Sequence, residues 1–349
     1  MGFPAKAEKS FRKFEVELMK GIIFATIIIT IFIAALLSGC VDNPETQIQV
    51  TPTSDAPVVQ EPEGTIRVSG AFALYPLMLK WSEEYQKLHP GVKFDISAGG
   101  AGKGMADVIG GLVDIGMLSR KISPAEEEKG AYWIAITKDA VVPTANKNNP
   151  VLSELKTRGL KREVFEKIYI NETIKTWGQA TGTGSADKIN VYTRADSAGA
   201  AETWASYLGK YKQENLKGVA VNGDPGLEEA VKQDTLGIGF NNIVFVYDQN
   251  TKKPVDGIEI IPLDQNGNGK IEEDEKVYGT LDDIVAAIGT GKYPSPPARD
   301  LFHVTKGKPT GIVQDFIKWT LTDGQKFIPE SGYIILPQGT INEGLKKVE

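Results

Sequence analysis

The sequence has little of the two side chains that most often bind transition metals. It contains a single cysteine, Cys40, and only two histidines, His89 and His303, in 349 residues. One cysteine excludes an intrachain disulfide and a zinc site built on thiolates, and two histidines are too few for a histidine-rich metal site. The polar neighbours of both histidines predict that each lies on the surface or in a loop.

The chain also lacks an excess of positive charge. Its 39 Lys and Arg residues against 45 Asp and Glu residues give a net charge of −6. A protein that binds nucleic acid needs a basic surface to meet the phosphate backbone, so we expect no nucleic-acid partner. The same deficit leaves no long-range attraction for a small anion. Any anion site must therefore work through local hydrogen-bond donors.

Long hydrophobic runs are scarce, and the one that stands out is Gly21–Leu37, which follows a basic segment. It is short for a membrane-spanning helix and slightly long for the apolar part of a signal peptide. The next residues, Leu37-Ser38-Gly39-Cys40, resemble a lipobox, in which the cysteine is lipidated and becomes the mature N-terminus. We predict a lipoprotein-type signal or anchor over residues 1–40, with Cys40 as the lipidation site; an uncleaved anchor with a chance cysteine is the alternative. Either possibility places the rest of the chain outside the cytoplasm, anchored to the outer face of the cell membrane.

Residues 41–64 are rich in Pro, Thr, Gln, Asp and Glu and show no apolar periodicity. This composition is typical of a segment that cannot bury enough apolar surface to fold. We expect a disordered tether, with the folded part starting near Thr65.

From Thr65 onward, short apolar strands alternate with segments of helical periodicity. The helical segment 75–88 ends at His89-Pro90-Gly91, where proline and glycine favour a turn, and the glycine-rich stretch 99–104 is predicted as a flexible loop. The alternation repeats in the middle of the chain and predicts an α/β fold with parallel strands. The expected strands are 65–69, 92–97, 114–118, 139–144, 189–193, 238–247 and 301–305, and the expected helices are 75–88, 105–112, 162–170, 171–177, 198–208, 225–233, 281–287 and 311–320.

Four segments at predicted strand ends have the chemistry to bind a small anion. Three are strand-to-helix turns of small residues, Ser69–Ala73, Ser97–Gly102 and Arg194–Ala200, and the fourth is Ser119-Arg120. Small residues let backbone N–H groups converge on a ligand, and the following helix adds its positive N-terminal end. The arginines of the last two segments can each offer a fork of donors to an oxyanion. Because ligands of α/β sheets gather at the carboxyl ends of strands, the four segments together predict an anion site.

Several longer stretches resemble the phosphate-binding proteins of ABC importers, most of all the archaeal-type branch of that family. The stretches, in chain order, are Ser69–Trp81, Ser97–Met105, Val113–Arg120, Arg194–Leu208 and Gly237–Phe240. The resemblance implies a two-lobed type II periplasmic-binding-protein fold of the α/β class, with a hinge, in which residues 65–143 and 243–349 form lobe 1 and residues 144–242 form lobe 2. It also implies a solute-binding protein rather than an enzyme, with a small inorganic anion as ligand and ABC permease subunits as partners.

The same resemblance implies a set of ligand-binding residues. They are Ala71, Phe72, Ala73, Ser97, Ala101, Ser119, Arg120, Arg194, Ala198, Gly199 and Ala200. The chain departs from the family pattern because two loops have lost hydroxyl groups and Ser119 stands where the family has an acidic acceptor. That acceptor takes a hydrogen bond from a protonated oxyanion. The anion therefore stays open between phosphate and another oxyanion, such as tungstate, molybdate or sulfate.

A separate motif, Asp264–Glu275, fits the calcium loop of an EF-hand at every defined position. The ligands expected from the template are Asp264, Asn266, Asn268, the carbonyl of Lys270, Glu272 and Glu275. The preceding segment, 258–263, has the pattern of a strand rather than of an EF-hand helix. We therefore expect a single loop that holds a structural calcium ion, Ca²⁺; an acidic Asn- and Gly-rich surface loop is the alternative.

Two further functions stay open at this point. A calcium-stabilised surface lipoprotein without a transport role would use the loop and the anchor but no anion site. An extracytoplasmic phosphatase would need a nucleophile and a base, and the sequence offers no such pair among its few histidines and its one cysteine. We therefore expect no enzymatic activity.

Overall fold

The computed structural model describes residues 62–349. All of them belong to one compact unit, Gln60–Glu349. The predicted signal or anchor, the lipidation site Cys40 and residues 41–61 of the predicted tether lie outside the described residues. Within residues 62–349, no helix is both long enough and apolar enough to cross a membrane.

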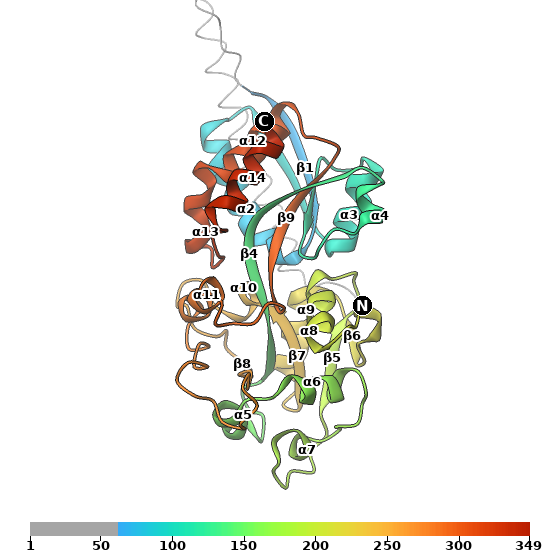
Figure 1. Cartoon of the computed structure of the whole chain (residues 1–349), viewed down its shortest axis with the longest axis vertical. Helices are drawn as coiled ribbons and strands as arrows, with labels where there is room; N and C mark the ends of the chain where they lie inside the picture. Colours follow the sequence, from blue (N-terminus) through green and yellow to red (C-terminus); the bar gives the residue numbers. More distant parts are fainter. Residues whose placement is uncertain (1–61) are drawn as a thin grey trace, which may run out of the picture. The chain divides into compact units, whose positions relative to one another are not determined.

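The first structured element is a strand that begins at Gly64, and strands and short helices alternate from there to the end of the chain (Figure 1). The strands are β1 (Gly64–Gly70), β2 (Val92–Ala98), β3 (Ile115–Leu118), β4 (Ala131–Asn146), β5 (Asn190–Arg194), β6 (Val219–Val221), β7 (Gly237–Asn242), β8 (Ile258–Ile260) and β9 (Ala298–Lys306). The helices are η1 (Phe72–Leu74), α2 (Tyr75–Leu88), α3 (Ala101–Gly110), α4 (Pro124–Glu127), α5 (Leu152–Arg158), α6 (Arg162–Tyr169), α7 (Trp177–Thr181), α8 (Gly199–Leu208), η2 (Gln213–Asn215), α9 (Gly223–Gln233), α10 (Ile243–Val246), α11 (Leu281–Gly289), α12 (Gly311–Leu321), η3 (Asp323–Lys326), α13 (Phe327–Glu330) and α14 (Gln338–Val348).

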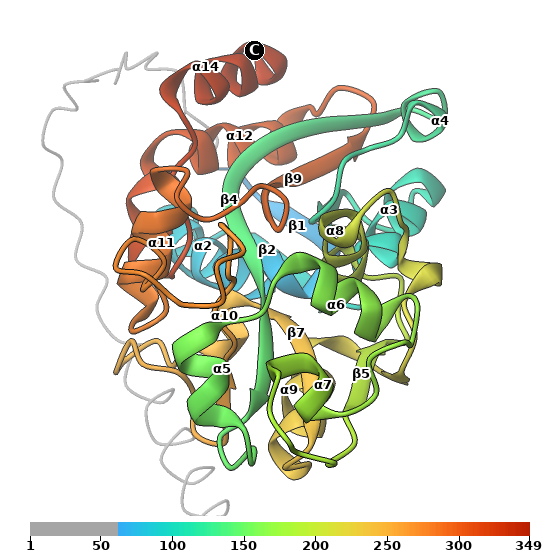
Figure 2. The same ribbon diagram turned by 60° about the horizontal axis from the view of Figure 1, so that its bottom comes forward.

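The strands form one nine-stranded sheet in the order β2-β1-β3-β9-β4-β7-β5-β6, with β8 paired to β4. β1 runs parallel to β2 and β3, and β5 runs parallel to β6 and β7. Between these two parallel sets, β9 and β4 run antiparallel to each other and to the neighbouring strands β3 and β7. The two long strands therefore connect the α/β unit around α2 and α3 with the α/β unit around α8 and α9 (Figures 1 and 2).

Each parallel set is covered by the helices that the chain forms between its strands. Helix α2 buries one face, with Leu77, Trp81 and Tyr85 each at most 1% exposed, and packs near β2. Helix α3 lies against β1 and β3, while α8 and α9 lie against β7. Burial of these apolar faces on both sides of the sheet is the main stabilising contribution, at roughly 25 cal/mol for each Å² of apolar surface removed from water.

Four expectations from the sequence differ from the structure. Of the stretch 99–104, which was expected to be a loop, only Gly99 and Gly100 are, because α3 begins at Ala101. Its glycines allow close packing instead: a Cβ at Gly104 would lie 2.7 Å from the Cα of Gly70. No helix forms over residues 171–176, because α7 begins only at Trp177. The strand expected to reach residue 247 ends at Asn242, and the chain then forms the short helix α10.

His303 is the fourth difference, because it lies in the core and not on the surface. It is 0% exposed on β9, with its ring 5.7 Å from that of Trp81 and 6.2 Å from that of Phe316. Strand β9 lies inside the sheet, between β3 and β4, and its residues Leu301, Phe302 and Val304 beside His303 are buried as well.

Candidate functional site

Residues from both parallel sets of strands line one small space that is partly open to solvent. The lining residues are Ala71, Phe72, Ala73, Gly100, Ala101, Ser119, Arg194, Ala198, Gly199, Ala200, Asp224 and Asn242. Every predicted ligand-binding residue except Ser97 and Arg120 is among them. The four segments singled out at strand ends thus contribute to the same site, as the rule for α/β sheets predicts.

The starts of two α-helices supply backbone donors to this space. Helix α8 follows Ala198, and α3 follows Gly100; neither helix has a side chain that caps its N-terminus. No hydrogen bond from the amides of Gly199, Ala200 or Ala101 is found within residues 62–349. Such amides carry the positive end of the helix dipole and are suited to an anion.

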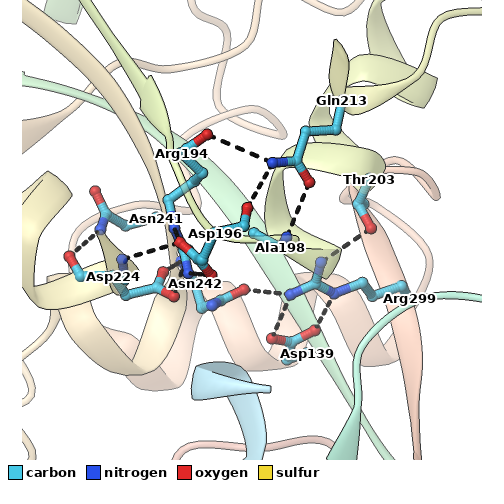
Figure 3. A network of polar contacts seen from close by, with 11 residues as sticks. Asp139, Arg194, Asp196, Ala198, Thr203, Gln213, Asp224, Asn241, Asn242 and Arg299 are labelled. Carbon is cyan, nitrogen blue, oxygen red and sulfur yellow. Dashed lines mark hydrogen bonds and ion pairs between the residues drawn. The ribbon is translucent and has the colours of Figure 1, made fainter. Parts of the chain in front are cut away.

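Arg194 contributes the only side chain with a positive charge in this lining. Its Nε and Nη2 donate to the two carboxylate oxygens of Asp196 at 2.8 and 2.7 Å, and its Nη1 donates to Asp224 Oδ2 at 2.7 Å (Figure 3). Its guanidinium also lies 5.5 Å from the ring centre of Phe72, at cation–π distance. One N–H on each terminal nitrogen is left over by these bonds and can reach a ligand.

The electrostatics of the site follow from that arrangement. Burial alone would lower the pKa of Arg194, but the carboxylates of Asp224 and Asp196 overcome this effect and raise it, so the guanidinium stays charged. One positive charge and two negative charges leave no net attraction for an anion. The helix amides must therefore contribute much of the stabilisation, as the acidic composition of the chain already required.

Close contacts hold the two sides of the space together. The Gly102 amide, in the first turn of α3, donates to the carbonyl oxygen of Ser197 at 2.9 Å. A Cβ at Gly199 would lie 2.2 Å from Ser119 Oγ, and a Cβ at Gly223 would lie 2.8 Å from the ring of Phe72. Glycine is therefore needed at both positions, because any side chain would force the surrounding segments apart.

Arg120 and Ser97 do not join this site. The Arg120 guanidinium donates to both carboxylate oxygens of Glu126, at 2.9 and 2.6 Å, and to the carbonyl of Lys121. Ser97 lies on β2 opposite Ser69, short of the lining residues. The strand-end argument that selected both residues did not take account of the acidic residue six positions after Arg120.

Three polar residues of the site were not predicted from the sequence: Asp196, Asp224 and Asn242. Asp196 stands two residues after Arg194 in the same motif, so it was within reach of sequence reasoning. Asp224 lies in the first turn of α9 and Asn242 at the end of β7. Both are at most 1% exposed, and the backbone N–H of Asn242 donates to Asp224 Oδ1 at 3.0 Å.

The loop 264–275 lies outside this site and buries two carboxylates. Asp264 is 4% and Glu275 3% exposed. Asp264 accepts the amides of Gly267 and Gly269, at 2.8 and 2.9 Å, and Glu275 accepts those of Gln265 and Glu272, at 2.8 and 3.1 Å. No group of three or more His, Cys, Asp or Glu side chains placed for a metal occurs in the described part of the chain. A calcium ion here would therefore depend on amide and carbonyl oxygens as well, which this ion accepts.

Comparison with known proteins places this geometry in a family. The family model described as "PBP superfamily domain" matches residues 51–324. The chain is 27% identical to the phosphate-binding protein PstS of Methanocaldococcus jannaschii, over 89% of this chain and 91% of that protein. It is also 27% identical to PstS of Staphylococcus haemolyticus, over 82% and 86% of the two chains. The resemblance to phosphate-binding proteins expected from the sequence motifs is thus confirmed.

Solved structures show the same fold. One is a proposed phosphate ABC transporter substrate-binding protein with bound phosphate from Clostridium perfringens, with a TM-score of 0.63 and 21% identity over 78% of this chain and all of that one. Another is an ABC-type phosphate transport receptor from Vibrio cholerae, with a TM-score of 0.57 and 24% identity over 78% of this chain and all of that one. The predicted α/β fold of the periplasmic-binding-protein type is confirmed, and the chain belongs to the PBP superfamily.

Proposed function

We propose that this protein captures inorganic phosphate outside the cytoplasm and delivers it to an ABC import system. One observation carries the proposal: helix starts and a buried, charged arginine, from segments far apart in the sequence, line the same small space. This donor set suits a small oxyanion. The names of the relatives, which are phosphate-binding proteins, support phosphate as that ion.

Binding would use hydrogen bonds rather than net charge. The free amides at the starts of α3 and α8 would donate to the oxygens of the ion, and the two remaining N–H groups of Arg194 would complete the contact from the opposite side. Each charge-assisted hydrogen bond in a buried site contributes about 1.5–3 kcal/mol. A few such bonds are sufficient for micromolar affinity or better.

The two-lobe organisation is part of the proposal. Lobe 1 would comprise residues 65–143 and 243–349, and lobe 2 residues 144–242. The two parallel sets of strands, joined through antiparallel β4 and β9, support a hinge at those connecting strands. Opening at the hinge would part the α3 start from the loop before α8 and release the ion.

A second oxyanion is favoured by one specific residue. Ser119 is 2% exposed and lines the site. Its hydroxyl is a weaker acceptor than a carboxylate for the hydrogen bond that a protonated oxyanion donates. Discrimination against fully ionised oxyanions then depends on Asp224, the remaining carboxylate of the lining. Sulfate, molybdate or tungstate is the alternative ligand.

Isothermal titration of the purified protein with phosphate, sulfate, molybdate and tungstate tests the proposal. Arg194→Met should weaken phosphate binding at least about 100-fold, because it removes two charge-assisted bonds. Arg120→Met is the matched control and should bind like the wild type. Since Arg194→Met also leaves two buried carboxylates unpaired, a second variant, Ala200→Asp, keeps the arginine network and places a carboxylate where the ion would bind. Wild-type protein that binds none of the four anions would refute the proposal.

The proposal includes the setting of the protein. We place it at the outer face of the cell membrane, held by the lipid on Cys40 or by the preceding apolar segment, with ABC permease subunits as its partners. We propose a binding protein and no catalyst, since the polar residues of the site offer donors but no nucleophile with an adjacent base.

We also propose a structural calcium ion in the loop 264–275. The buried carboxylates of Asp264 and Glu275, together with the side-chain oxygens of Asn266 and Asn268, support this site. Backbone N–H groups satisfy these carboxylates in part, but no Lys or Arg among residues 62–349 pairs with either of them, and a bound cation would balance their charge. Calcium would then stabilise the fold without touching the anion.

A further inference from the structure

We propose that the Asn242 side chain is a further anion-binding donor, and that Arg299, paired with Asp139, is the positioning residue that holds it in the binding orientation. This inference rests on the proposed function and deepens it, because it assigns a binding role to a residue that neither the motifs nor the backbone amides supply.

The position of Asn242 fits such a role. It is the last residue of β7 and stands at the N-cap position of α10 without a capping side-chain bond, and it lines the small space together with Arg194 and Asp224. It is only 1% exposed, so almost all of its side chain is shielded from bulk water. Its backbone is held as well, since the Asn242 N–H donates to Asp224 at 3.0 Å.

The orientation of the amide follows from the chemistry of its neighbour. Arg299 Nη2 donates to Asn242 Oδ1, and Figure 3 shows the amide oxygen turned toward that guanidinium. A guanidinium has no acceptor, so an amide flipped by 180° would set N–H groups against N–H groups. The Asn242 Nδ2 group must therefore point away from Arg299, and it has no hydrogen-bond partner within residues 62–349. It is a donor available to an acceptor in the site.

Arg299 is itself fixed in place. It lies directly opposite Asp139 in the antiparallel pairing of β4 and β9, and its Nε and Nη2 donate to the two oxygens of Asp139 at 2.9 and 3.2 Å. Its Nη1 donates to Thr203 Oγ1 on α8 at 2.9 Å. The side chains of Arg299 and Asp139 are 8% and 0% exposed. The pair therefore links the two long connecting strands to α8 and to the end of β7.

A neutral donor at this position has a physical purpose. The two carboxylates around Arg194 cancel its attraction for an anion, and a further cation would itself need a partner. A buried amide adds a hydrogen bond to an oxyanion oxygen without adding charge. An amide turned the other way would present its oxygen to the ion and repel it. The hydrogen bond from Arg299 to Asn242, which we call the clamp, therefore keeps the amide in the orientation that binds.

Two variants and one spectrum test the inference. Asn242→Asp keeps the size and the contact with Arg299 but replaces the donor by an acceptor, and it should weaken phosphate binding at least 100-fold. The double variant Asp139→Leu/Arg299→Met removes the clamp and both buried charges together, which proteins often tolerate; with Asn242 free to turn, affinity should fall about 10-fold. In ¹⁵N-labelled wild-type protein, the side-chain amide signals that disappear in Asn242→Asp should shift on addition of phosphate.

The neighbouring cross-strand pair is the matched control. Lys138 and Asp300 lie one position along the same two strands, 3.7 Å apart and partly exposed. Lys138→Gln/Asp300→Asn should leave the affinity and the Asn242 signals unchanged. If wild-type protein binds phosphate and Asn242→Asp binds it equally well, or the Asn242 amide signals do not move, this inference is wrong while the proposed function stands. If wild-type protein binds no oxyanion, both fail together.

Discussion

Arg194 and Asp224 form a fully buried ion pair: Nη1 and Oδ2 lie 2.7 Å apart, and the two side chains are 1% and 0% exposed. Asp224 also accepts the backbone N–H of Asn242, so one carboxylate orients both the charged and the neutral donor of the site. The pair joins β5 to α9 across 30 residues of sequence. Its loss would thus affect stability and the site together.

Asp224→Asn should lower the free energy of unfolding by about 3 kcal/mol, because it leaves a buried guanidinium with one counter-charge fewer. Urea unfolding, followed by circular dichroism, measures the change. Glu163→Gln is the comparison: Glu163 pairs with Arg162 at 3.0 Å on the surface, with both side chains at least half exposed, and its loss should cost less than about 1 kcal/mol. Equal effects for the two variants would contradict the assignment of the buried pair.

Gly104→Ala should destabilise the protein by about 2 kcal/mol. The new Cβ would lie 2.7 Å from the Cα of Gly70 and 3.0 Å from the carbonyl oxygen of Met117, and backbone atoms in a packed sheet cannot give way. Gly110→Ala, in the same helix, meets nothing closer than 3.8 Å and should be neutral or stabilising by up to about 1 kcal/mol. Thermal unfolding of both variants measures the contrast, and a destabilised Gly110→Ala would count against it.

His303 should make stability depend on pH. Burial lowers the pKa of His303 from 6.5 to about 3, and neither ring nitrogen has a hydrogen-bond partner among the described residues. The unfolded chain therefore takes up a proton below pH 6.5 that the folded protein takes up only near pH 3. This contribution to stability is complete above pH 6.5 and is lost as the pH falls, by up to about 1.4 kcal/mol for each pH unit.

The measurement is the unfolding free energy of wild-type protein and His303→Leu between pH 7 and pH 4.5. The difference between the two should change by roughly 2.5 kcal/mol over this range in favour of the variant. The comparison cancels the carboxylates that titrate in the same range. Parallel pH profiles would show that His303 takes up its proton in both states alike.

Calcium should raise the midpoint of thermal unfolding, and a chelator should lower it. By mass action, calcium at 100 times its dissociation constant stabilises the folded state by about 2.7 kcal/mol. Glu275→Gln removes the buried carboxylate at the last ligand position and should abolish the shift. Glu273→Gln, an exposed neighbour paired with Lys276, should keep it. Magnesium, which demands a smaller and more regular site, should shift the midpoint less than calcium.

Local patterns in the sequence were sufficient for much of the fold. The apolar spacing of α2 and its Pro-Gly stop predicted Tyr75–Leu88 as the structure has it. The motif around Arg194 also predicted the start of α8 to within one residue. These features depend on neighbours in the chain, and their physical causes lie within a few residues.

What could not be predicted depends on contacts between distant segments. Asp224 and Asn242 reach the site only because β7 pairs with β5 and α9 packs on both, a pairing that no local pattern shows. The prediction of Arg120 as a ligand residue was wrong for a local reason. The short helix α4, whose start is capped by Ser123 and Glu126, brings the Glu126 carboxylate to the Arg120 guanidinium. The burial of His303 likewise follows from the central place of β9 in the sheet.

The contact between the first turn of α3 and the loop before α8 has a kinetic consequence. On the proposed function, an ion enters when the hinge opens, and that opening must break the hydrogen bond from the Gly102 amide to the Ser197 carbonyl. Association should then be slower than diffusion allows and should level off at high ion concentration. With a net charge of −6, the protein repels an anion at long range, so added salt, which screens that repulsion, should raise the association rate modestly.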